Sequence, residues 1–178
     1  IQADTYFNRI KDKIIAVPST NLFRWMMINQ GLVTIKGIDV NAEYNRLLWS
    51  KILLQFGVGY TYQKALDKTA RSSSYNHQIP YTPVHSGSLH GSLQWRSWTL
   101  NYSYLYTGDR YVLPENKPIN YMQPWYTTDL GIVWEKKVKN KQYRISLEVN
   151  NVFNQYYDVV LNYPMPGTNF RTMFSLTL

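Results

Sequence analysis

The feature of this sequence that most limits its fold is the alternation of apolar and polar side chains with a period of two residues. From Trp98 to Tyr104, every second residue is Trp, Leu or Tyr, and the residues between them are Thr, Asn and Ser. Phe170, Phe174 and Leu176 alternate in the same way with Arg171, Ser175 and Thr177. Because consecutive side chains of a strand point to opposite faces, this period indicates sheets with one apolar and one polar face.

The pattern recurs eight times along the chain. We expect strands over residues 3–14, 32–45, 51–64, 82–96, 98–108, 125–136, 142–153 and 169–178. Most of them exceed the ~5–6 residues usual in globular sheets and reach the ~9–11 that cross a bilayer at a tilt. In the second strand, Val33 and Ile35 differ in parity from Ile38 and Val40. We expect a β-bulge at Gly37 to restore the register.

The connections between these strands are alternately long and short. The long ones are 15–31, 65–81, 109–124 and 154–168, and the short ones are 46–50, 97 and 137–141. Long loops at one end and tight turns at the other are typical of outer-membrane barrels, whose long loops are extracellular and whose short turns are periplasmic. The sequence therefore predicts an all-β fold, an antiparallel transmembrane β-barrel segment of about eight strands, with both termini on the short-turn side.

Composition agrees with a membrane barrel better than with a soluble β-sandwich, whose strands also alternate. Aromatic residues make up 16% of the chain and charged residues only 17%. We expect interfacial aromatic girdles at Trp95, Trp98, Trp125, Tyr126, Tyr62 and Tyr106. The chain has no Cys and a net charge of +8. Its Lys and Arg residues are scattered and cluster mainly at Lys136, Lys137, Lys139 and Lys141, which favours a solvated turn over a nucleic-acid surface. Its first residues do not resemble a signal peptide.

The end of the chain carries a recognisable motif. The stretch "LEVNNVFNQYYDVVLNYPMPGTNFRTMFSLTL" resembles the last hairpin of TonB-dependent outer-membrane receptors. The matching residues are Asn151, Phe153, Asn154, Tyr157, Tyr163, Pro164, Pro166 and Gly167. Upstream, "TIKGIDVNAEY" and "YFNRIKDKI" resemble two further strands of these barrels. The chain departs from the pattern at Asn162, where Gly is common, at Thr168, where Arg is usual, and at Leu178, where the family ends in an aromatic residue.

This resemblance implies a barrel of about 22 strands, plugged by an N-terminal domain and importing a siderophore, haem, cobalamin or glycan with energy from TonB. Residues 1–178 would be the C-terminal part of that barrel, without the plug domain. The implied location is the outer membrane of a Gram-negative bacterium, crossed many times. The implied partners are outer-membrane lipid, the rest of the barrel and the plug, the TonB complex through the plug, a small-molecule or oligosaccharide ligand and a possible surface lipoprotein. Neither nucleic acid nor a cofactor is expected, and no enzymatic activity.

Ligand contacts are expected in the long loops, where a rigid scaffold presents binding residues. The candidates are the cationic and aromatic side chains of loops 65–81 and 109–124. They are Arg71, Tyr75, His77, Arg110, Tyr111 and Tyr121. Such side chains suit anionic siderophores as well as planar or sugar ligands.

Two other interpretations remain open at this stage. A free-standing eight-stranded structural or adhesion barrel would have a native mass near the 21.0 kDa of this chain, whereas a receptor would be several times larger. A barrel hydrolase would use His90 with Ser86, Ser88 or Ser92, although no acid lies nearby in that strand.

His77, His85 and His90 fit no common metal spacing. The expected lumen charges, paired with each other or facing a plug or water, are Asp39, Glu43, Asp129, Glu135, Arg144, Glu148 and Arg171.

Overall fold

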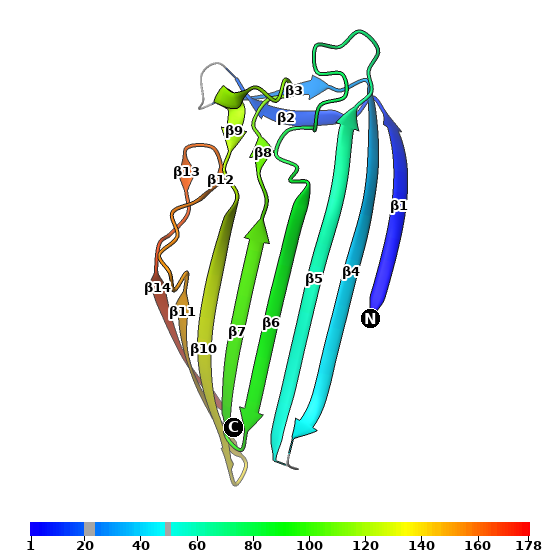
Figure 1. Ribbon diagram of the computed structural model, residues 1–178. Helices are drawn as coiled ribbons and strands as arrows, with labels where there is room; N and C mark the ends of the chain where they lie inside the picture. Colours follow the sequence, from blue (N-terminus) through cyan, green and yellow to red (C-terminus); the bar gives the residue numbers. More distant parts are fainter. Residues whose placement is uncertain (20–23, 49–50) are drawn as a thin grey trace.

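The computed structural model describes residues 1–19, 24–48 and 51–178. Eight long strands form one antiparallel sheet (Figure 1). They are β1 (Gln2–Lys11), β4 (Leu32–Leu48), β5 (Ile52–Asp67), β6 (His85–Trp95), β7 (Trp98–Thr107), β10 (Trp125–Val138), β11 (Lys141–Asn150) and β14 (Asn169–Thr177). The eight predicted strands are confirmed, each with its bounds within three residues.

The sheet is open. Its order runs from β1 through β4, β5, β6, β7, β10 and β11 to β14, and the two edge strands do not pair with each other. The strands curve into a trough, and both ends of the chain lie at the lower ends of their strands, toward the short-turn side (Figure 1). The described residues therefore form a segment of barrel wall and not a closed eight-stranded barrel.

The long connections contain small structures that the sequence did not predict. They are the hairpin of β2 (Ile14–Pro18) with β3 (Trp25–Asn29), the pair β8 (Arg110–Tyr111) with β9 (Tyr121–Met122), the 3₁₀ turn η1 (Pro118–Asn120), and the pair β12 (Asp158–Val160) with β13 (Tyr163–Pro164). Segments this short show too few alternations to be recognised. Parts of two predicted connections, residues 20–23 and 49–50, lie outside the described residues. Among the described residues, no helix is long and apolar enough to cross a membrane.

The outer face of the sheet is a continuous apolar surface because the register is unbroken across the strands. One cross-strand row consists of Leu54, Leu93, Leu100, Ile132 and Leu147, and the next of Ile52, Trp95, Trp98, Trp134, Ile145 and Phe174. Leu100 is 51% exposed and Phe174 63%. An apolar face of this extent is unfavourable in water but favourable in lipid. It is the face that the sequence predicted to contact lipid.

Most of the residues predicted for the aromatic girdles lie on the outer face of the sheet, toward the ends of their strands. Trp95 pairs with Trp98 near the short turns, and Tyr106 pairs with Tyr126 toward the long loops, all on the outer face. Trp125 was predicted wrongly as a girdle residue. It pairs with Thr107 on the inner face and is only 9% exposed. Since neighbouring residues of a strand face opposite ways, the outward Tyr126 forces Trp125 inward.

The predicted bulge at Gly37 is also wrong. Gly37 pairs regularly with Tyr6 and with Gln63, and neither ladder shifts its register. The parity of the apolar residues changes because Val33 and Ile35 point inward, where they form a small core at the long-loop end with Ala65 and Ile79. The glycine serves another purpose. A Cβ at this position would lie 2.3 Å from the Tyr6 ring, which packs over it.

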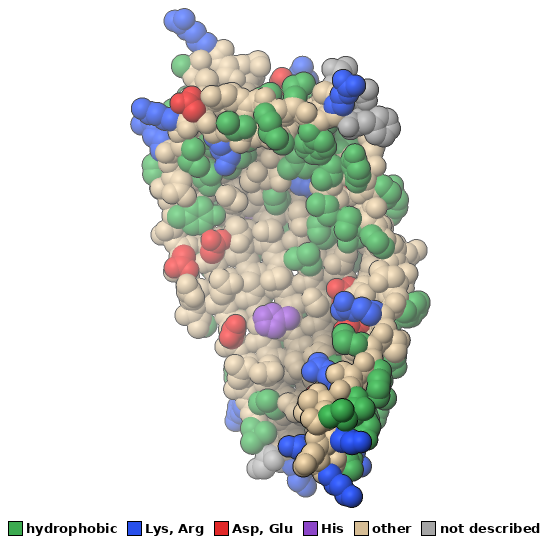
Figure 2. Space-filling model, turned by 180° about the vertical axis from the view of Figure 1, so that it is seen from behind, with side chains coloured by type: hydrophobic (Ala, Val, Ile, Leu, Met, Phe, Trp, Pro, Cys, Tyr) green, Lys and Arg blue, Asp and Glu red, His purple; other side chains and the backbone are tan. Residues whose placement is uncertain are grey.

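The inner face is polar and lines the trough. One cross-strand row consists of Asn45, Gln55, Ser92, Asn101, Gly131, Glu148 and Arg171, and the adjacent row of Glu43, Gly57, His90, Ser103 and Asp129. Figure 2 shows this hollowed face, with a histidine and acidic side chains on its floor and hydrophobic side chains toward the loop end. All seven charges predicted for the lumen lie on this face.

The His90 ring lies over Gly57, where an added Cβ would come within 2.3 Å of its Cε1 atom. We expect Gly57→Ala to displace the exposed His90 ring and to lower the free energy of unfolding of the protein by about 0.5–1.5 kcal/mol, the cost of an off-rotamer side chain. Urea unfolding in detergent measures this. The double variant with His90→Ala is expected to recover most of the loss relative to His90→Ala alone. Gly91→Ala, whose Cβ would have no neighbour closer than 4.0 Å, is the matched control. Equal stability of Gly57→Ala and Gly91→Ala would contradict the contact.

Candidate functional site

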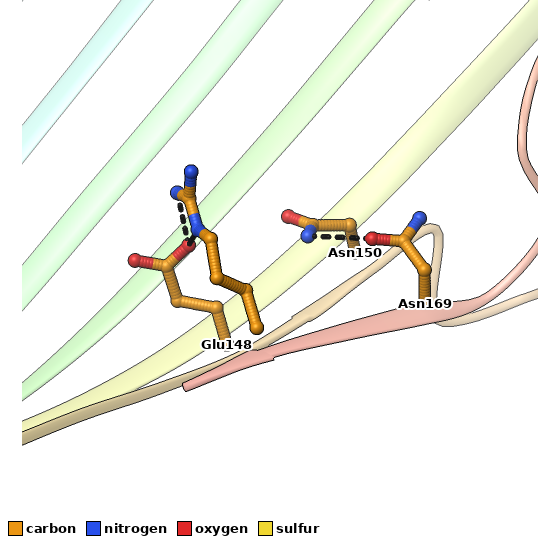
Figure 3. Close-up of polar contacts among 4 residues, drawn as sticks. Glu148, Asn150 and Asn169 are labelled. Carbon is orange, nitrogen blue, oxygen red and sulfur yellow. Dashed lines mark hydrogen bonds and ion pairs between the residues drawn. The ribbon is translucent and has the colours of Figure 1, made fainter. Parts of the chain in front are cut away.

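Polar side chains on the inner face pair across β11 and β14. The Arg171 guanidinium donates to Glu148 Oε2 through both Nε, at 2.8 Å, and Nη2. Asn150 Nδ2 donates to Asn169 Oδ1 at 3.0 Å. Figure 3 shows the side chains of Glu148, Asn150 and Asn169 on the same side of the strand pair. Arg171 keeps 65% of its side chain exposed, so the row can also bond to whatever fills the trough.

Asn151 lies at the centre of the terminal motif. It is almost fully buried and has a φ of 50°. Its backbone N–H donates to Asp129 Oδ1 at 2.8 Å. Its side-chain amide donates to the carbonyls of Gln155 and Pro166, and its Oδ1 accepts from the Gln155 backbone N–H. A side chain that mimics a backbone turn in this way ends β11 and draws the two sides of the last loop together.

Asn154 and Thr168 complete this network of hydrogen bonds. The Thr168 backbone N–H donates to Asn154 Oδ1 at 3.0 Å, and its hydroxyl donates to the Asn151 carbonyl at 2.8 Å. A Cβ on Gly167 would lie 2.4 Å from Asn154 Oδ1, so this approach requires glycine. The conspicuous end motif therefore holds the last loop in shape, and Thr168 makes its own contacts where the family usually has Arg.

The remaining motif residues lie around the same loop. The Tyr157 ring packs on the Trp125 ring with centroids 4.5 Å apart. Tyr163 and Pro164 form β13, and Phe153 is exposed. Tyr157 thus connects the last loop to the start of β10.

The long loops are bonded to one another at this end of the sheet. The Gln78 backbone N–H donates to Asn116 Oδ1, and Asn116 Nδ2 donates back to the Gln78 carbonyl, at 2.8 and 2.9 Å. The Tyr81 backbone N–H donates to the Tyr111 carbonyl at 2.8 Å. These bonds join the loop that follows β5 to the loop that follows β7.

Arg110 joins the last loop to this assembly. It is 3% exposed, and its Nη2 donates to the carbonyls of Asp158 and Val159 at 2.5 and 3.2 Å. Burial lowers the pKa of Arg110, and the charge of Asp158 partly offsets that effect. Burial also raises the pKa of Tyr81, whose ring lies 5.9 Å from that of Trp25. All four long connections therefore meet around Tyr81 and Arg110.

Asp67, at the loop end of β5, organises the turn that follows. It is 2% exposed and accepts from the hydroxyls of Ser72 and Ser74, at 3.0 and 2.7 Å, and from the Thr69 backbone N–H at 2.8 Å. Burial alone raises the pKa of this carboxyl, but the hydrogen bonds outweigh it and leave the pKa below its usual value. The carboxylate is therefore charged and structural.

The six residues predicted to contact ligand fall into two groups. Arg110, Tyr111 and Tyr121 come together through the β8–β9 pair, where the two tyrosine rings meet edge to face at 5.7 Å. Arg71, Tyr75 and His77 lie in the turn after Asp67, with Arg71 and Tyr75 exposed. Sequence reasoning missed a pocket between residues 121–125 and 155–161, lined partly by Trp125, Tyr156, Tyr157 and Asp158. The adjacent Tyr156 and Tyr157 were the one sequence signal that could have indicated this pocket, but only the fold brings them beside Trp125.

The residues weighed for catalysis or metal binding are not arranged for either. His90 lies on the same face as Ser86, Ser88 and Ser92, as predicted. Within the described parts of the chain, its ring makes no side-chain hydrogen bond to a serine or an acid. No group of three or more His, Asp or Glu residues in those parts could hold a metal ion.

Comparison with known proteins identifies the family. The model of the family "TonB dependent receptor-like, beta-barrel" matches residues 1–152. The chain belongs to this family. No match was found among curated proteins.

Solved structures share the fold. The chain resembles the copper transporter OprC, with a TM-score of 0.65 and 15% identity over 96% of this chain and 27% of the other. It resembles the ferric-catecholate import receptor Fiu from E. coli K12, with a TM-score of 0.68 and 16% identity over 98% and 24%. For the FrpB iron transporter from Neisseria meningitidis, F5-1 variant, the values are 0.61 and 16% over 96% and 27%. The chain therefore spans about a quarter of the length of these three proteins.

Arg110→Ala is expected to free the last loop from the loop that follows β7, because it removes two charge-assisted hydrogen bonds to the carbonyls of Asp158 and Val159. Such bonds contribute about 1.5–3 kcal/mol each. Hydrogen exchange of the amides in residues 155–165 is expected to accelerate, and Arg110→Lys to recover part of the protection. Arg71→Ala, in an exposed turn, is the control. Unchanged exchange in Arg110→Ala would contradict this role.

Asp67→Asn is expected to lower the free energy of unfolding by about 1–3 kcal/mol at pH 7, because the hydroxyl and amide donors lose their charged acceptor. Since the folded pKa lies below the unfolded value of about 3.9, the stabilisation is fully present above that value and is lost as the pH falls through the folded pKa. The difference between wild type and variant, measured by urea unfolding, is therefore expected to shrink below about pH 4. A difference independent of pH would refute the charged state.

Proposed function

We propose that this chain is the C-terminal part of the barrel of an outer-membrane receptor, which imports a scarce ligand with energy from the TonB complex. The observation that carries the proposal is the family match over residues 1–152, on a curved wall with one apolar and one polar face. The plug domain and the remaining strands would belong to other parts of the same protein. The two edge strands, β1 and β14, would pair with those strands, since lipid does not tolerate unpaired edges.

The two faces support this assignment in different ways. The outer apolar rows would contact outer-membrane lipid of a Gram-negative bacterium. The inner polar rows, with partly exposed groups such as Arg171, would face the plug and water. The ion pairs of Glu148 with Arg171 and of Glu135 with Arg144 leave free donors and acceptors for such contacts.

The loop end would bind the ligand. Its four connections are tied together around Arg110 and Tyr81, which provides the rigid support that a binding surface needs. The candidate ligands are a siderophore, haem, cobalamin or a glycan. The similar structures are named as transporters of copper and of iron, and these names do not choose among the four candidates. A surface lipoprotein that covers the loops is a further proposed partner.

The test is a nutrient screen in the host bacterium. We expect deletion of the receptor to abolish growth on one scarce nutrient out of a panel of ferric siderophores, haem, cobalamin and oligosaccharides. Loss of TonB is expected to give the same defect. Full-length receptor restores growth, and so does a variant with two glycines inserted in the short turn at residues 139–140. A variant in which residues 109–124 are replaced by Gly-Ser repeats does not restore it. Uptake that persists without TonB, or without this C-terminal region, would refute the proposal.

A further inference from the structure

Three cationic side chains gather on the outer face of the sheet at its short-turn end. Lys136 of β10 and Lys141 of β11 are exposed, and the register makes them diagonal neighbours on that face. The Glu135 backbone N–H donates to the Ser97 carbonyl at 2.8 Å, which continues the ladder between β7 and β10. Lys136 therefore lies beside the turn that carries Arg96. We call Arg96, Lys136 and Lys141 the basic triad.

No acidic side chain of the sheet balances the basic triad. Within the eight long strands, as far as the structure describes them, every Asp and Glu points to the inner face. Glu135, next to Lys136 in the chain, accepts from Gln142 Nε2 at 2.6 Å and pairs with Arg144 Nη1 at 3.6 Å on that inner side. Like charges close together on one face of a sheet repel each other. The basic triad therefore favours an anion from outside the chain.

Tryptophan side chains place the basic triad at the level of lipid headgroups. Trp95, Trp98 and Trp134 belong to one cross-strand row on the outer face, and the first two are 43% and 45% exposed. The Arg96 guanidinium lies over the Trp95 ring, 4.9 Å from its centroid. Outward tryptophans settle where hydrocarbon meets headgroups, and long cationic side chains extend from there toward water. The basic triad therefore lies where a bilayer has its phosphate groups.

An apolar groove on the outer face begins beside the basic triad. It has a volume of about 350 Å³ and is lined by Trp98, Ile132, Trp134, Ile145 and Leu147. A second apolar hollow, of about 680 Å³, shares Ile132 and Leu147 with it and extends toward the middle of the sheet. Both volumes fall in the range of ~300–1,000 Å³ that is typical of ligand sites. The groove has room for the hydrocarbon part of a ligand whose charged part reaches the triad.

The groove and the basic triad together narrow the class of ligand. Free phosphate would neutralise the triad but would leave the groove unfilled. A zwitterionic phospholipid would fill the groove, but its own ammonium group would lie near three positive side chains. An anionic phospholipid fills the groove and brings its phosphate without a second cation. Clusters of Lys and Arg at a membrane surface attract such lipids.

We propose that the basic triad and the groove bind one anionic phospholipid from the leaflet on the short-turn side. Its phosphate group contacts Arg96, Lys136 and Lys141, and an acyl chain lies in the groove against Ile145 and Leu147. The site rests on the proposed function for its orientation, in which the short turns face the periplasm. The lipid is a bound component of the barrel wall and not the imported ligand.

The test uses the full-length receptor in detergent and measures bound lipid by native mass spectrometry. The probes are phosphatidylglycerol, which is anionic, phosphatidylethanolamine, which is zwitterionic, and bisphosphorylated lipid A. Inorganic phosphate is added as a competitor. We expect one phosphatidylglycerol to bind at least about tenfold more tightly than phosphatidylethanolamine, and inorganic phosphate not to displace it.

Substitutions in the basic triad are expected to remove this preference. Arg96→Gln, Lys136→Gln and Lys141→Gln should each weaken phosphatidylglycerol binding about fivefold, and the triple variant about a hundredfold. The matched control is Lys137→Gln, which removes the same charge from the next residue of β10, on the inner face, and is expected to bind normally. Ile145→Trp fills the groove and is expected to weaken binding without any change of charge.

Several results would overturn the lipid site. They are equal binding of phosphatidylglycerol and phosphatidylethanolamine, a triple variant that binds like Lys137→Gln, and displacement of the lipid by inorganic phosphate. Retention of lipid A in preference to phosphatidylglycerol would overturn the assignment to a phospholipid.

Uptake of nutrients is measured separately and distinguishes this site from the proposed function. TonB-dependent uptake in a receptor whose lipid binding ignores the basic triad would refute the lipid site alone. Triad-dependent binding of phosphatidylglycerol in a receptor without TonB-dependent uptake of any nutrient would uphold the lipid site and refute the transport role.

Discussion

The structure depends on one uninterrupted antiparallel ladder of backbone hydrogen bonds across eight strands. A slip of one residue between any two strands would move every side chain beyond it to the other face. The register therefore decides at once which residues contact lipid and which line the trough. It places Leu100 outward beside Leu93 and Ile132, and Asn101 inward beside Ser92. The same ladder satisfies the backbone polar groups inside the wall, which lipid cannot do.

Above the ladder, order comes from side chains that bond to the backbone. Asn151 forms hydrogen bonds with the backbone where β11 ends, and Asp67 does so where β5 ends. Arg110 donates to two carbonyls of a loop almost fifty residues away in the chain. Long loops lack repeating ladders, so buried polar side chains with satisfied bonds give them a single shape. A binding surface at this end would gain rigidity from these bonds, and the pocket between residues 121–125 and 155–161 lies beside the Arg110 contact.

Much of the fold could be predicted because strand alternation is a local signal. The strands around Trp98–Tyr104 and Phe170–Leu176 were predicted from their own residues, and their faces agree with the structure. The predictions that failed concern residues whose position is set by packing against a residue far away in the sequence. Gly37 makes room for the Tyr6 ring instead of forming a bulge, and Trp125 packs on Tyr157 instead of facing the membrane interface. Of the candidate site, the sequence pointed to Tyr121 but not to the partners that surround it.

The sequence by itself determined the class of structure, the number of long strands, their two faces and the family, because periodicity and a terminal motif are written in consecutive residues. Only the tertiary structure decided which loop residues meet. Arg110 was a candidate for ligand contact in the sequence, yet it lies buried against Asp158 and supports the loops. Trp125 and Tyr156 lie thirty-one residues apart in the chain and line one pocket because β10 and β11 are antiparallel neighbours whose loop ends coincide.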